Sequence, residues 1–421
     1  MVKRTGQILI LFNQFPKLSE IFLFREIELW EKLGLNILPV SLLPCNYGEL
    51  GGRMRAWQSR TLYPAQWAAH ADPPGAAWLA LKNAGLTGRV LTESLMDANR
   101  GVQRLGDSLG GWLAGIGLAG LIQRHRPVHI HAAWANAPAQ AAHMASLLTG
   151  VSYSVAIHAA DYWRAGPLLG PRLLGAEWVV ACNRKVHQNL LANLPAIADK
   201  LFLYPHALDQ ATFYPVQRSV HGSWRLLCVG RLVGKKGLPT LIRACRQLQA
   251  SGIDFICDII GAGPLASALR RLIASLGLQD RVRLLGARQP QEVARAMQQG
   301  HLLVSASHKS ADGDQEGLPN VVLEALLTQL PVVASRTGSV DEIIVPGQTG
   351  FVAQPENPGS LAQAVLQALE DYPRALQTAR EGRRRVLQRA AEQNQGRWLA
   401  DRFVRKTGIR TEPSVTRPMP A

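Results

Sequence analysis

Short apolar runs alternate with segments of helical spacing over most of the chain. Residues 7–12 (QILILF) form a continuous apolar run of strand length, and residues 19–34 repeat apolar positions at helical spacing before a glycine. Residues 35–43 form a second apolar run. Because buried strands that alternate with helices are typical of parallel sheets, this order predicts a doubly wound α/β domain at the amino end.

The rest of the first half predicts further strands and a helical region. Residues 53–125 are rich in alanine and tryptophan and predict a set of helices. The apolar stretch at 109–122 is shorter than the roughly 20 residues of a membrane-spanning helix, so we expect no such helix. The first apolar run is short and lacks a small-residue cleavage site, which favours a buried strand over a secretory signal. Three more strands are expected at 128–135, 153–161 and 178–183.

A break in the pattern falls at residues 205–222, which are polar and contain prolines. A second strand–helix series follows, so the sequence predicts two Rossmann-like doubly wound domains that face each other across a cleft. Ligands of such sheets bind at the carboxyl ends of the strands, which makes the cleft the expected site. We place the domains at 1–205 and 206–390, a helix that crosses back to the first domain at 391–406, and a disordered tail at 407–421.

The composition fits two globular domains with a strong positive charge. The 421 residues are 47% hydrophobic and 18% charged, enough for two sizeable cores. Five scattered cysteines indicate buried thiols in a reducing compartment. The formal net charge of +16 predicts an anionic partner, which is nucleic acid, a membrane surface or a phosphorylated substrate. The basic cluster at 380–389 is either a solvated helix face or a surface that attracts anionic lipid.

Two strand-to-helix junctions of the second series carry glycines and bases. Gly230 ends one strand and is followed by Arg231 and Lys236, whose charges suit a diphosphate. Gly261 and Gly263 form a tight turn after the next strand. An ordinary basic surface loop explains the first junction equally well, and a tight turn explains the second without a ligand.

A third junction, EGLPNVVLEAL at 316–326, places two carboxylates around a predicted helix start. Pro319 suits the first helical turn, so Glu316 is expected in the loop above the strand ends. Glu324 lies inside an apolar helix, where a carboxylate needs a partner such as sugar hydroxyls. The spacing alone leaves three alternatives open: a pair of general acids, a binding site or plain surface charge.

Together these stretches resemble the carboxyl-terminal domain of retaining glycosyltransferases of the two-domain GT-B type, family 4. The motifs GRLVGKKG, GAGP, EGLPNVVLEAL, PVVAS and GQTGFV occur in that order between residues 230 and 352. In the amino half, FPKLSEIF, HIHAAWANAPAQAA and HAADYW are similar to segments of bacterial exopolysaccharide transferases of the colanic-acid type. The resemblance covers nearly the whole chain and implies a GT-B fold.

The resemblance implies roles for the matching residues of the second half. Arg231 and Lys236 are expected to neutralise the departing diphosphate, Glu316 to face the donor sugar and Glu324 to hold the ribose hydroxyls. The backbone N–H groups at the helix start are expected near the sugar and phosphates. The full set of implied donor-binding residues is Gly230, Arg231, Lys236, Gly261, Gly263, Glu316, Gly317, Leu318, Pro319 and Glu324.

In the first half the resemblance implies that His158 contacts the donor sugar and acts in catalysis with Glu316, Arg231 and Lys236. Asp161 is expected to support the His158 loop. The implied acceptor-side residues are Ser19, Glu20, His131 and Asp161, although a packed or capping role explains His131, and likewise His206, as well. Two positions depart from the common pattern: Ala159 stands where many relatives have glycine, and TGSVDE stands where a GGxxE-like turn is usual.

The implied reaction moves a sugar from a nucleotide-diphosphate sugar to a hydroxyl of a lipid-linked oligosaccharide, with retention and no enzyme nucleophile. We expect no cofactor and no metal, since no His/Asp/Cys group shows metal-ligand spacing in the sequence. We expect a cytoplasmic enzyme, peripherally bound to the anionic inner face of the plasma membrane. The alternatives are an idle nucleotide-sugar-binding subunit and a nucleic-acid-binding protein. The sequence contains no helix-turn-helix, RNP-type or zinc signature for the latter.

Overall fold

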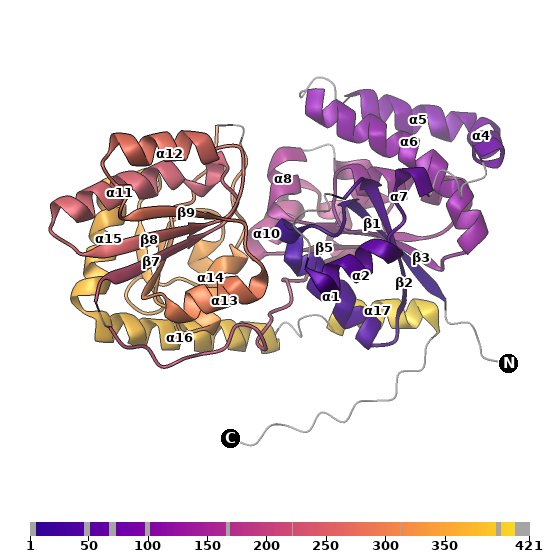
Figure 1. Ribbon diagram of the computed structural model, residues 1–421. Coiled ribbons are helices and arrows are strands. Elements are labelled where there is room, and N and C mark those ends of the chain that lie inside the picture. Colours follow the sequence, from indigo (N-terminus) through magenta and orange to yellow (C-terminus); the bar gives the residue numbers. More distant parts are fainter. Residues whose placement is uncertain are drawn as a thin grey trace, which may run out of the picture. The chain divides into compact units, whose positions relative to one another are not determined.

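The chain forms two compact units in the computed structural model (Figure 1). The first unit comprises Met1–Cys182, His187–His206 and Asn394–Ala421, and the second comprises Asn183–Val186 and Ala207–Gln393. The structure describes residues 6–45, 51–66, 73–96, 102–165, 169–220, 222–311, 313–392 and 397–408. The tail expected at 407–421 lies outside the described residues beyond Gly408.

The first unit contains a six-stranded parallel sheet in the order β2-β1-β3-β4-β5-β6. The five strands expected from the apolar runs are present, and the pattern missed only the three-residue β6. The strands are β1 (Gln7–Gln14), β2 (Asn36–Leu43), β3 (His129–Ala132), β4 (Tyr153–Ile157), β5 (Trp178–Ala181) and β6 (Leu201–Leu203). Every residue of β3, β4 and β5 is buried, as continuous apolar strands of parallel sheets are.

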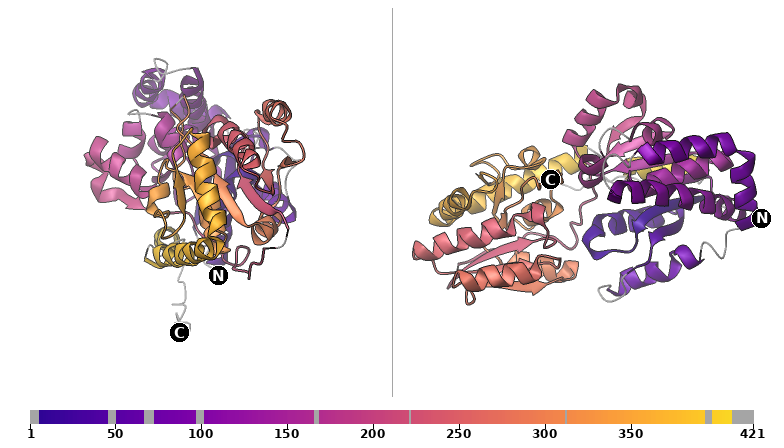
Figure 2. Two further views of the ribbon diagram at one scale, coloured as in Figure 1. Left: turned by 90° about the vertical axis from the view of Figure 1, so that its left-hand side faces the viewer. Right: turned by 90° about the horizontal axis from the view of Figure 1, so that it is seen from above.

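Helices connect these strands and cover the sheet (Figures 1 and 2). The last helix belongs to the first unit although it follows the second unit in the chain. Its Leu399, Ala400 and Phe403 are fully buried in the same core as Ile8 and Trp30. The helices are α1 (Ile21–Lys32), α2 (Gly52–Arg60), α4 (Pro73–Lys82), α5 (Ala84–Met96), α6 (Val102–His125), α7 (Ala137–Thr149), α8 (Ala159–Ala165), α9 (Gly170–Leu174), α10 (Arg184–Asn193) and α17 (Arg397–Thr407).

Helix α6 corrects the length expected for the apolar stretch at 109–122. It has 24 residues, and its segment Leu105–His125 is long and apolar enough to cross a membrane by length and composition. The sequence argument was wrong on this point because the polar flanks are helical too. Half of that segment is buried inside the unit, where Gly111 and Gly115 lie close against α7. Glycine allows this approach, since an added Cβ at Gly115 would lie 2.5 Å from Cβ of Met144.

The second unit contains another six-stranded parallel sheet, in the order β12-β11-β10-β7-β8-β9. Its strands are β7 (Trp224–Val229), β8 (Phe255–Ile260), β9 (Val282–Gly286), β10 (Leu302–Ser305), β11 (Val332–Ser335) and β12 (Phe351–Ala353). Its helices are α11 (Leu238–Ala250), α12 (Ala266–Ser275), α13 (Pro290–Gln299), α14 (Asn320–Leu327), α15 (Pro358–Glu370) and α16 (Tyr372–Glu392).

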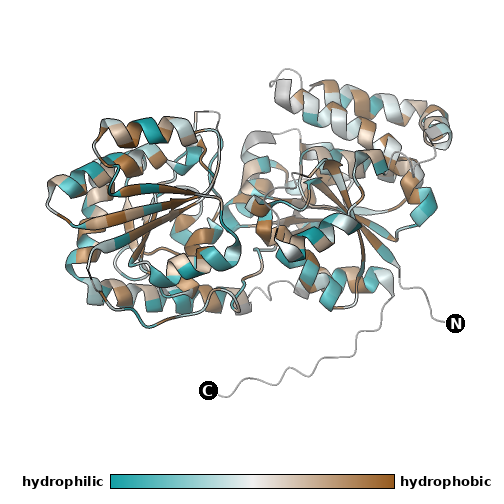
Figure 3. Cartoon of the chain, in the orientation of Figure 1, coloured by the Kyte–Doolittle hydropathy of each residue, from teal (hydrophilic) through white to brown (hydrophobic). Residues whose placement is uncertain are grey.

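Two apolar cores lie on the two faces of the second sheet. One is formed with α11, α12 and α15, and the other with α13, α14 and α16. The strands at the centre of each unit are coloured mostly as hydrophobic in Figure 3. Four of the five cysteines are buried and Cys182 is half-buried. The prediction of two Rossmann-like doubly wound α/β domains is therefore confirmed for each unit by itself.

Candidate active site

The second sheet reverses its strand order between β7 and β10. From β7 the chain builds outward through β8 and β9, then returns to the other side of β7 and builds β10, β11 and β12. The loops that follow β7 and β10 therefore diverge at adjacent strand ends. Ligands of open α/β sheets bind at this position, so the β7 and β10 loops define the candidate site.

These two loops bring four charged side chains together. The β7 loop contains a short 3-10 helix, Gly234–Lys236, and carries Lys235 and Lys236. The β10 loop carries Asp314 and Glu316. Lys236 Nζ lies 3.2 Å from Glu316 Oε1, and Lys235 Nζ lies 3.1 Å from Asp314 Oδ1 and 3.5 Å from Glu316 Oε1. All four side chains are mostly buried, so each charge depends on the others.

Glu316 is ionised in this cluster. Burial acts to raise the pKa of its carboxyl, but the charges of Lys236 and Lys235 outweigh burial and hold the pKa below its usual value. Arg231 also acts on this carboxylate and is itself exposed. Three cations thus face two carboxylates, which leaves one positive charge in excess at the strand ends. This arrangement suits an anionic ligand with several oxygens.

The expected glycine loops hold this cluster through close backbone contacts. Gly261 has φ +149°, and a Cβ there would lie 1.8 Å from the carbonyl oxygen of Gly230. A Cβ at Gly263 would lie 2.6 Å from the carbonyl oxygen of Leu232. The Leu232 N–H donates to the Ala262 carbonyl at 2.9 Å, so the β7 and β8 loops are hydrogen-bonded together. These close contacts require glycine at both positions whether or not a ligand binds.

The EGLPNVVLEAL junction differs by one residue from its expected geometry. Helix α14 begins at Asn320, and Pro319 is its extended N-cap residue rather than part of its first turn. Gly317 and Leu318 form the bend before it, and the Gly317 carbonyl accepts a hydrogen bond from the Ser339 N–H at 3.0 Å. Glu324 lies inside α14 with 9% of its surface exposed. Glu316 and Glu324 therefore have different surroundings and do not form a matched acid pair.

In the first unit, Asp161 fixes the two loops that follow β3 and β4. Its carboxylate accepts hydrogen bonds from the backbone N–H groups of Ala135 and His158, each at 2.6 Å, and of Tyr162 at 3.1 Å. Burial raises the pKa of Asp161 to about 7, and the backbone donors oppose that shift. His158 follows β4 directly, and its Nε2 lies 3.0 Å from the Ala133 carbonyl. Asp161 thus positions the His158 loop.

The other expected acceptor-side residues lie in two different environments. Ser19 and Glu20 belong to the 3-10 helix Leu18–Glu20 that follows β1. Ser19 is exposed, and the Glu20 carboxylate forms an ion pair with Lys17 at 2.8 Å. His131 lies inside β3, is 2% exposed and shares a hydrogen bond with Ser154 at 2.8 Å. These surroundings favour the packed-histidine alternative for His131.

Two features of the chain were not found from the sequence. Lys235 was overlooked beside Lys236, although the structure buries it against Asp314. The sequence shows no His/Asp/Cys group at metal-ligand spacing, but in the fold His158, Cys182 and His206 each offer a ligand atom within 4.8 Å of the others. Linear spacing could not reveal this group, because it does not show which strand ends become neighbours.

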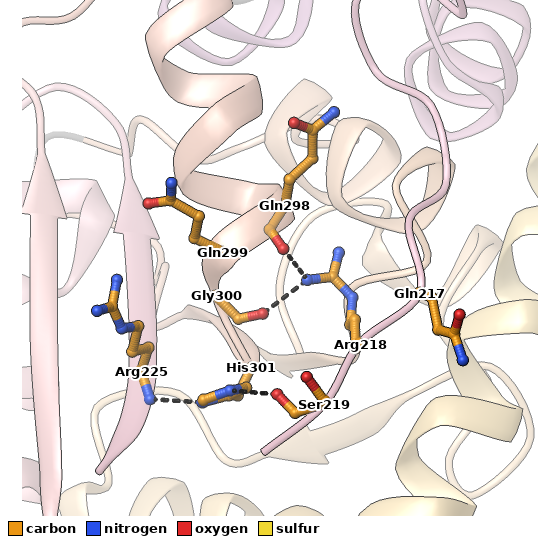
Figure 4. A pocket seen from close by; sticks show the side chains of 8 residues that line it. All are labelled: Gln217, Arg218, Ser219, Arg225, Gln298, Gln299, Gly300 and His301. Atoms are coloured by element: carbon orange, nitrogen blue, oxygen red, sulfur yellow. Dashed lines mark hydrogen bonds between the residues drawn. The ribbon is translucent and has the colours of Figure 1, made fainter. Parts of the chain in front are cut away.

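A pocket of about 560 Å³ lies at the amino ends of β7 and β10, away from the strand ends that carry the cluster (Figure 4). Arg218 lies in its wall and donates to the carbonyls of Met297, Gln298 and Gly300, and to those of Thr328 and Gln329. These groups end α13 and α14, so the guanidinium caps two helices. The pocket lining is Gln217, Arg218, Ser219, Arg225, Gln298, Gln299, Gly300 and His301.

The two Rossmann-like units have the fold of GT-B glycosyltransferases. The Anabaena protein HepE, solved in complex with UDP and glucose, matches with a TM-score of 0.66 and 16% identity over 96% of this chain and 99% of its own. A sucrose-phosphate synthase from Thermosynechococcus elongatus matches with a TM-score of 0.69 and 16% identity over 95% of this chain and 98% of its own. These likenesses show the fold.

Residues 209–385 match the family described as "Glycosyl transferases group 1". This match covers most of the second unit and agrees with the glycosyltransferase resemblance of the sequence motifs. The amylovoran biosynthesis glycosyltransferase AmsK of Erwinia amylovora is 31% identical over 243 residues, 56% of this chain and 59% of its own length. The colanic acid biosynthesis glycosyltransferase WcaL of Escherichia coli, described as putative, is 34% identical over 138 residues, 33% of this chain and 34% of its own length. The alignments thus span about a third to three fifths of these relatives.

Proposed function

We propose that this protein is a retaining glycosyltransferase that moves a sugar from a nucleotide-diphosphate sugar to an acceptor hydroxyl in bacterial exopolysaccharide biosynthesis. The observation that carries the proposal is the cluster of Arg231, Lys235, Lys236, Asp314 and Glu316 at the switch point of a group 1 domain. The names of AmsK and WcaL support the polysaccharide pathway.

In the proposed reaction the bond between the anomeric carbon and the diphosphate oxygen breaks. The acceptor oxygen bonds to the same face of that carbon, and the acceptor proton passes to the departing diphosphate. Arg231 and Lys236 stabilise the leaving charge, so the protein contributes positioning and electrostatics rather than a nucleophile or a metal. The ion pair with Glu316 holds Lys236 in place before the donor binds.

Glu316, Glu324 and His158 have separate roles in this proposal. Glu316 faces the donor sugar from the β10 loop and Glu324 holds the ribose hydroxyls from α14. His158 contacts the donor sugar from the first unit. The start of α14 presents backbone N–H groups and the positive end of its dipole to the phosphates.

Nucleotide release from a panel of UDP- and GDP-sugars, with membrane extract as the acceptor source, tests this function. The Glu324→Gln variant should mainly raise the donor KM, about tenfold, because one charged hydrogen-bond partner is lost. The Glu316→Gln variant should also lower kcat. Glu381→Gln removes an exposed helical carboxylate of the same unit and serves as the control. If no donor in the panel gives nucleotide release, the proposed enzyme activity is contradicted.

The panel also separates the two alternative functions. An idle binding subunit would bind one nucleotide sugar without releasing nucleotide in any extract. A nucleic-acid-binding protein would retain nucleic acid through purification, and would shift labelled DNA or RNA after nuclease treatment. Turnover by nuclease-treated protein favours the transferase.

We also propose that the acceptor is lipid-linked and that the protein binds the cytoplasmic face of the membrane peripherally. The net charge of +16 supports attraction to anionic lipid. Helix α4 supports apolar insertion, because Pro74, Ala77, Trp78 and Leu81 follow helical spacing and are all exposed. Lys82 lies 5.0 Å from the Trp78 ring, a pairing suited to a membrane–water interface.

A further inference from the structure

Three potential metal ligands lie at the carboxyl ends of three neighbouring strands. His158 follows β4, Cys182 follows β5 and His206 lies just beyond β6, and these strands pair in parallel in that order. Parallel strands end at one edge of the sheet, so residues far apart in the sequence become neighbours. One ring nitrogen of each histidine and the Sγ of Cys182 lie within 4.8 Å of one another.

The ring of His158 is oriented so that its Nδ1 can accept a ligand bond. Its Nε2 lies 3.0 Å from the Ala133 carbonyl, which only accepts, so Nε2 carries the hydrogen and Nδ1 has a lone pair. His158 is 7% exposed, and its Nδ1 is buried with no hydrogen-bond partner. A buried acceptor without a partner is costly and requires an explanation.

The second histidine has the carboxylate neighbour that metal-binding histidines usually have. His206 Nδ1 lies 3.4 Å from Oε1 of Glu26, whose side chain is almost fully buried. A carboxyl oxygen that accepts a hydrogen bond from one ring nitrogen directs the other nitrogen, Nε2, towards a metal. Burial raises the pKa of Glu26 to about 8, so this carboxyl adds little negative charge near pH 7. Arg25 acts on His206 and opposes a bound cation, which leaves a Cys182 thiolate to offset that charge.

Aromatic side chains enclose this group. The Phe22 ring centroid lies 3.9 Å from that of His206, and the Trp134 centroid lies 4.5 Å from that of His158. Such walls exclude water and strengthen the interaction of a cation with its ligands. Two imidazoles and one thiolate form a ligand set that suits Zn²⁺.

We propose that His158, Cys182 and His206 bind a thiophilic divalent cation, of which Zn²⁺ is the type, with a fourth position open. Tetrahedral bonds of about 2.0–2.3 Å place ligand atoms about 3.3–3.7 Å apart, so the side chains draw together by up to about 1 Å on binding. The rings of His158 and His206 are stacked, with centroids 5.0 Å apart and an interplanar angle of 21°, so they must also turn towards a common point. Cys182 and His206 are half-buried, whereas His158 is buried.

Metal binding also has a consequence that rests on the proposed function. If His158 contacts the donor sugar, the same side chain cannot hold a metal at that moment. Zn²⁺ is then an inhibitor that competes with the donor, and it is not a participant in the reaction.

Co²⁺ titration of the full chain, followed by absorption spectroscopy, tests the site independently of activity. We expect one equivalent of Co²⁺ to give tetrahedral visible bands and a near-ultraviolet band from the thiolate–cobalt bond. Cys182→Ala removes the near-ultraviolet band, and His206→Gln weakens Zn²⁺ binding at least about tenfold in a chelator competition. Cys245→Ala, which removes a buried thiol of the second unit, leaves both signals unchanged.

Each outcome separates the metal site from the proposed function. A missing thiolate band, or the same band in Cys182→Ala, overturns the site even if the protein turns over sugar donors. A Co²⁺ signal without turnover supports the metal site and overturns the transferase proposal. If the donor KM stays the same when the site is saturated with Zn²⁺, only the claim that Zn²⁺ competes with the donor is overturned. Circular dichroism confirms that each variant is folded, and His206→Gln decides the result if Cys182→Ala does not fold.

Discussion

Replacing Gly261 with alanine should separate the β7 and β8 loops that hold the candidate site. The new Cβ would lie 1.8 Å from the Gly230 carbonyl oxygen and 2.8 Å from its carbon, both backbone atoms that no side-chain rotation relieves. The loops must therefore move apart by more than about 1 Å to reach van der Waals contact. That movement strains the hydrogen bonds from Gly230 N–H to Ile260 O and from Leu232 N–H to Ala262 O.

The expected cost combines backbone strain and weakened hydrogen bonds. A φ of +149° costs alanine about 1–3 kcal/mol, and each weakened bond costs about 1 kcal/mol, which gives about 3–5 kcal/mol in all. For a unit of this size the melting temperature should fall by roughly 10 °C. Because Gly230 and Arg231 move with the loop, the donor KM should rise as well.

Gly277→Ala is the matched control, measured in the same thermal unfolding and donor-kinetics assays. Gly277 has φ +65°, and a Cβ added there would meet no atom within 4 Å, so only the backbone cost of about 1 kcal/mol applies. If both variants lose the same stability and keep the wild-type KM, the close contact at Gly230 has no energetic importance and the reasoning is refuted.

Three further predictions concern stability and membrane binding. Burial lowers the pKa of His143 to about 4, whereas its ordinary value is 6.5, so the folded state loses stability as the pH falls below 6.5. Urea unfolding should show that the free energy of unfolding drops by about 2 kcal/mol by pH 5, and His143→Gln should remove this drop. Arg218→Ala should lower the free energy of unfolding in urea by about 3 kcal/mol and leave the donor KM unchanged. Its control, Arg225→Ala in the same pocket, should lower that free energy by less than about 0.5 kcal/mol. Trp78→Asp should weaken flotation with anionic vesicles at least about tenfold; equal binding would exclude α4 as the contact.

The strand–helix order could be predicted because each element carries a local signal. Continuous apolar runs marked the central strands, and a glycine after a helical repeat marked the end of α1. The two missed strands, β6 and β12, have only three residues each, which is too short for any period to show. The length of α6 was missed because polar residues at its ends interrupt the apolar stretch without ending the helix.

The candidate site was predictable only as far as its loops. The charged residues after the strands at 224–229 and 302–305 were visible, but the choice between Lys235 and Lys236 depends on how the β7 loop turns. The short 3-10 helix there points Lys235 at Asp314 and Lys236 at Glu316. Such pairing is a tertiary contact with no signature in the spacing of residues.

The histidine and cysteine group carried a weaker signal that could have been used. Two of its members, His158 and Cys182, lie in the later parts of the segments predicted as strands, and parallel strands end at a common edge of their sheet. What the sequence lacked was the order of the strands. Only the sheet order β4-β5-β6 makes His158, Cys182 and His206 neighbours.

The core of the first unit takes side chains from two segments that are separated in the sequence by the whole second unit, and this affects how the protein is made. Phe403 of α17 is fully buried, and its ring centroid lies 5.1 Å from that of Trp30. Helix α17 follows α16, which belongs to the second unit. The first unit therefore cannot complete its core until the second unit has been synthesised, which departs from the usual amino-terminal-first order of cotranslational folding.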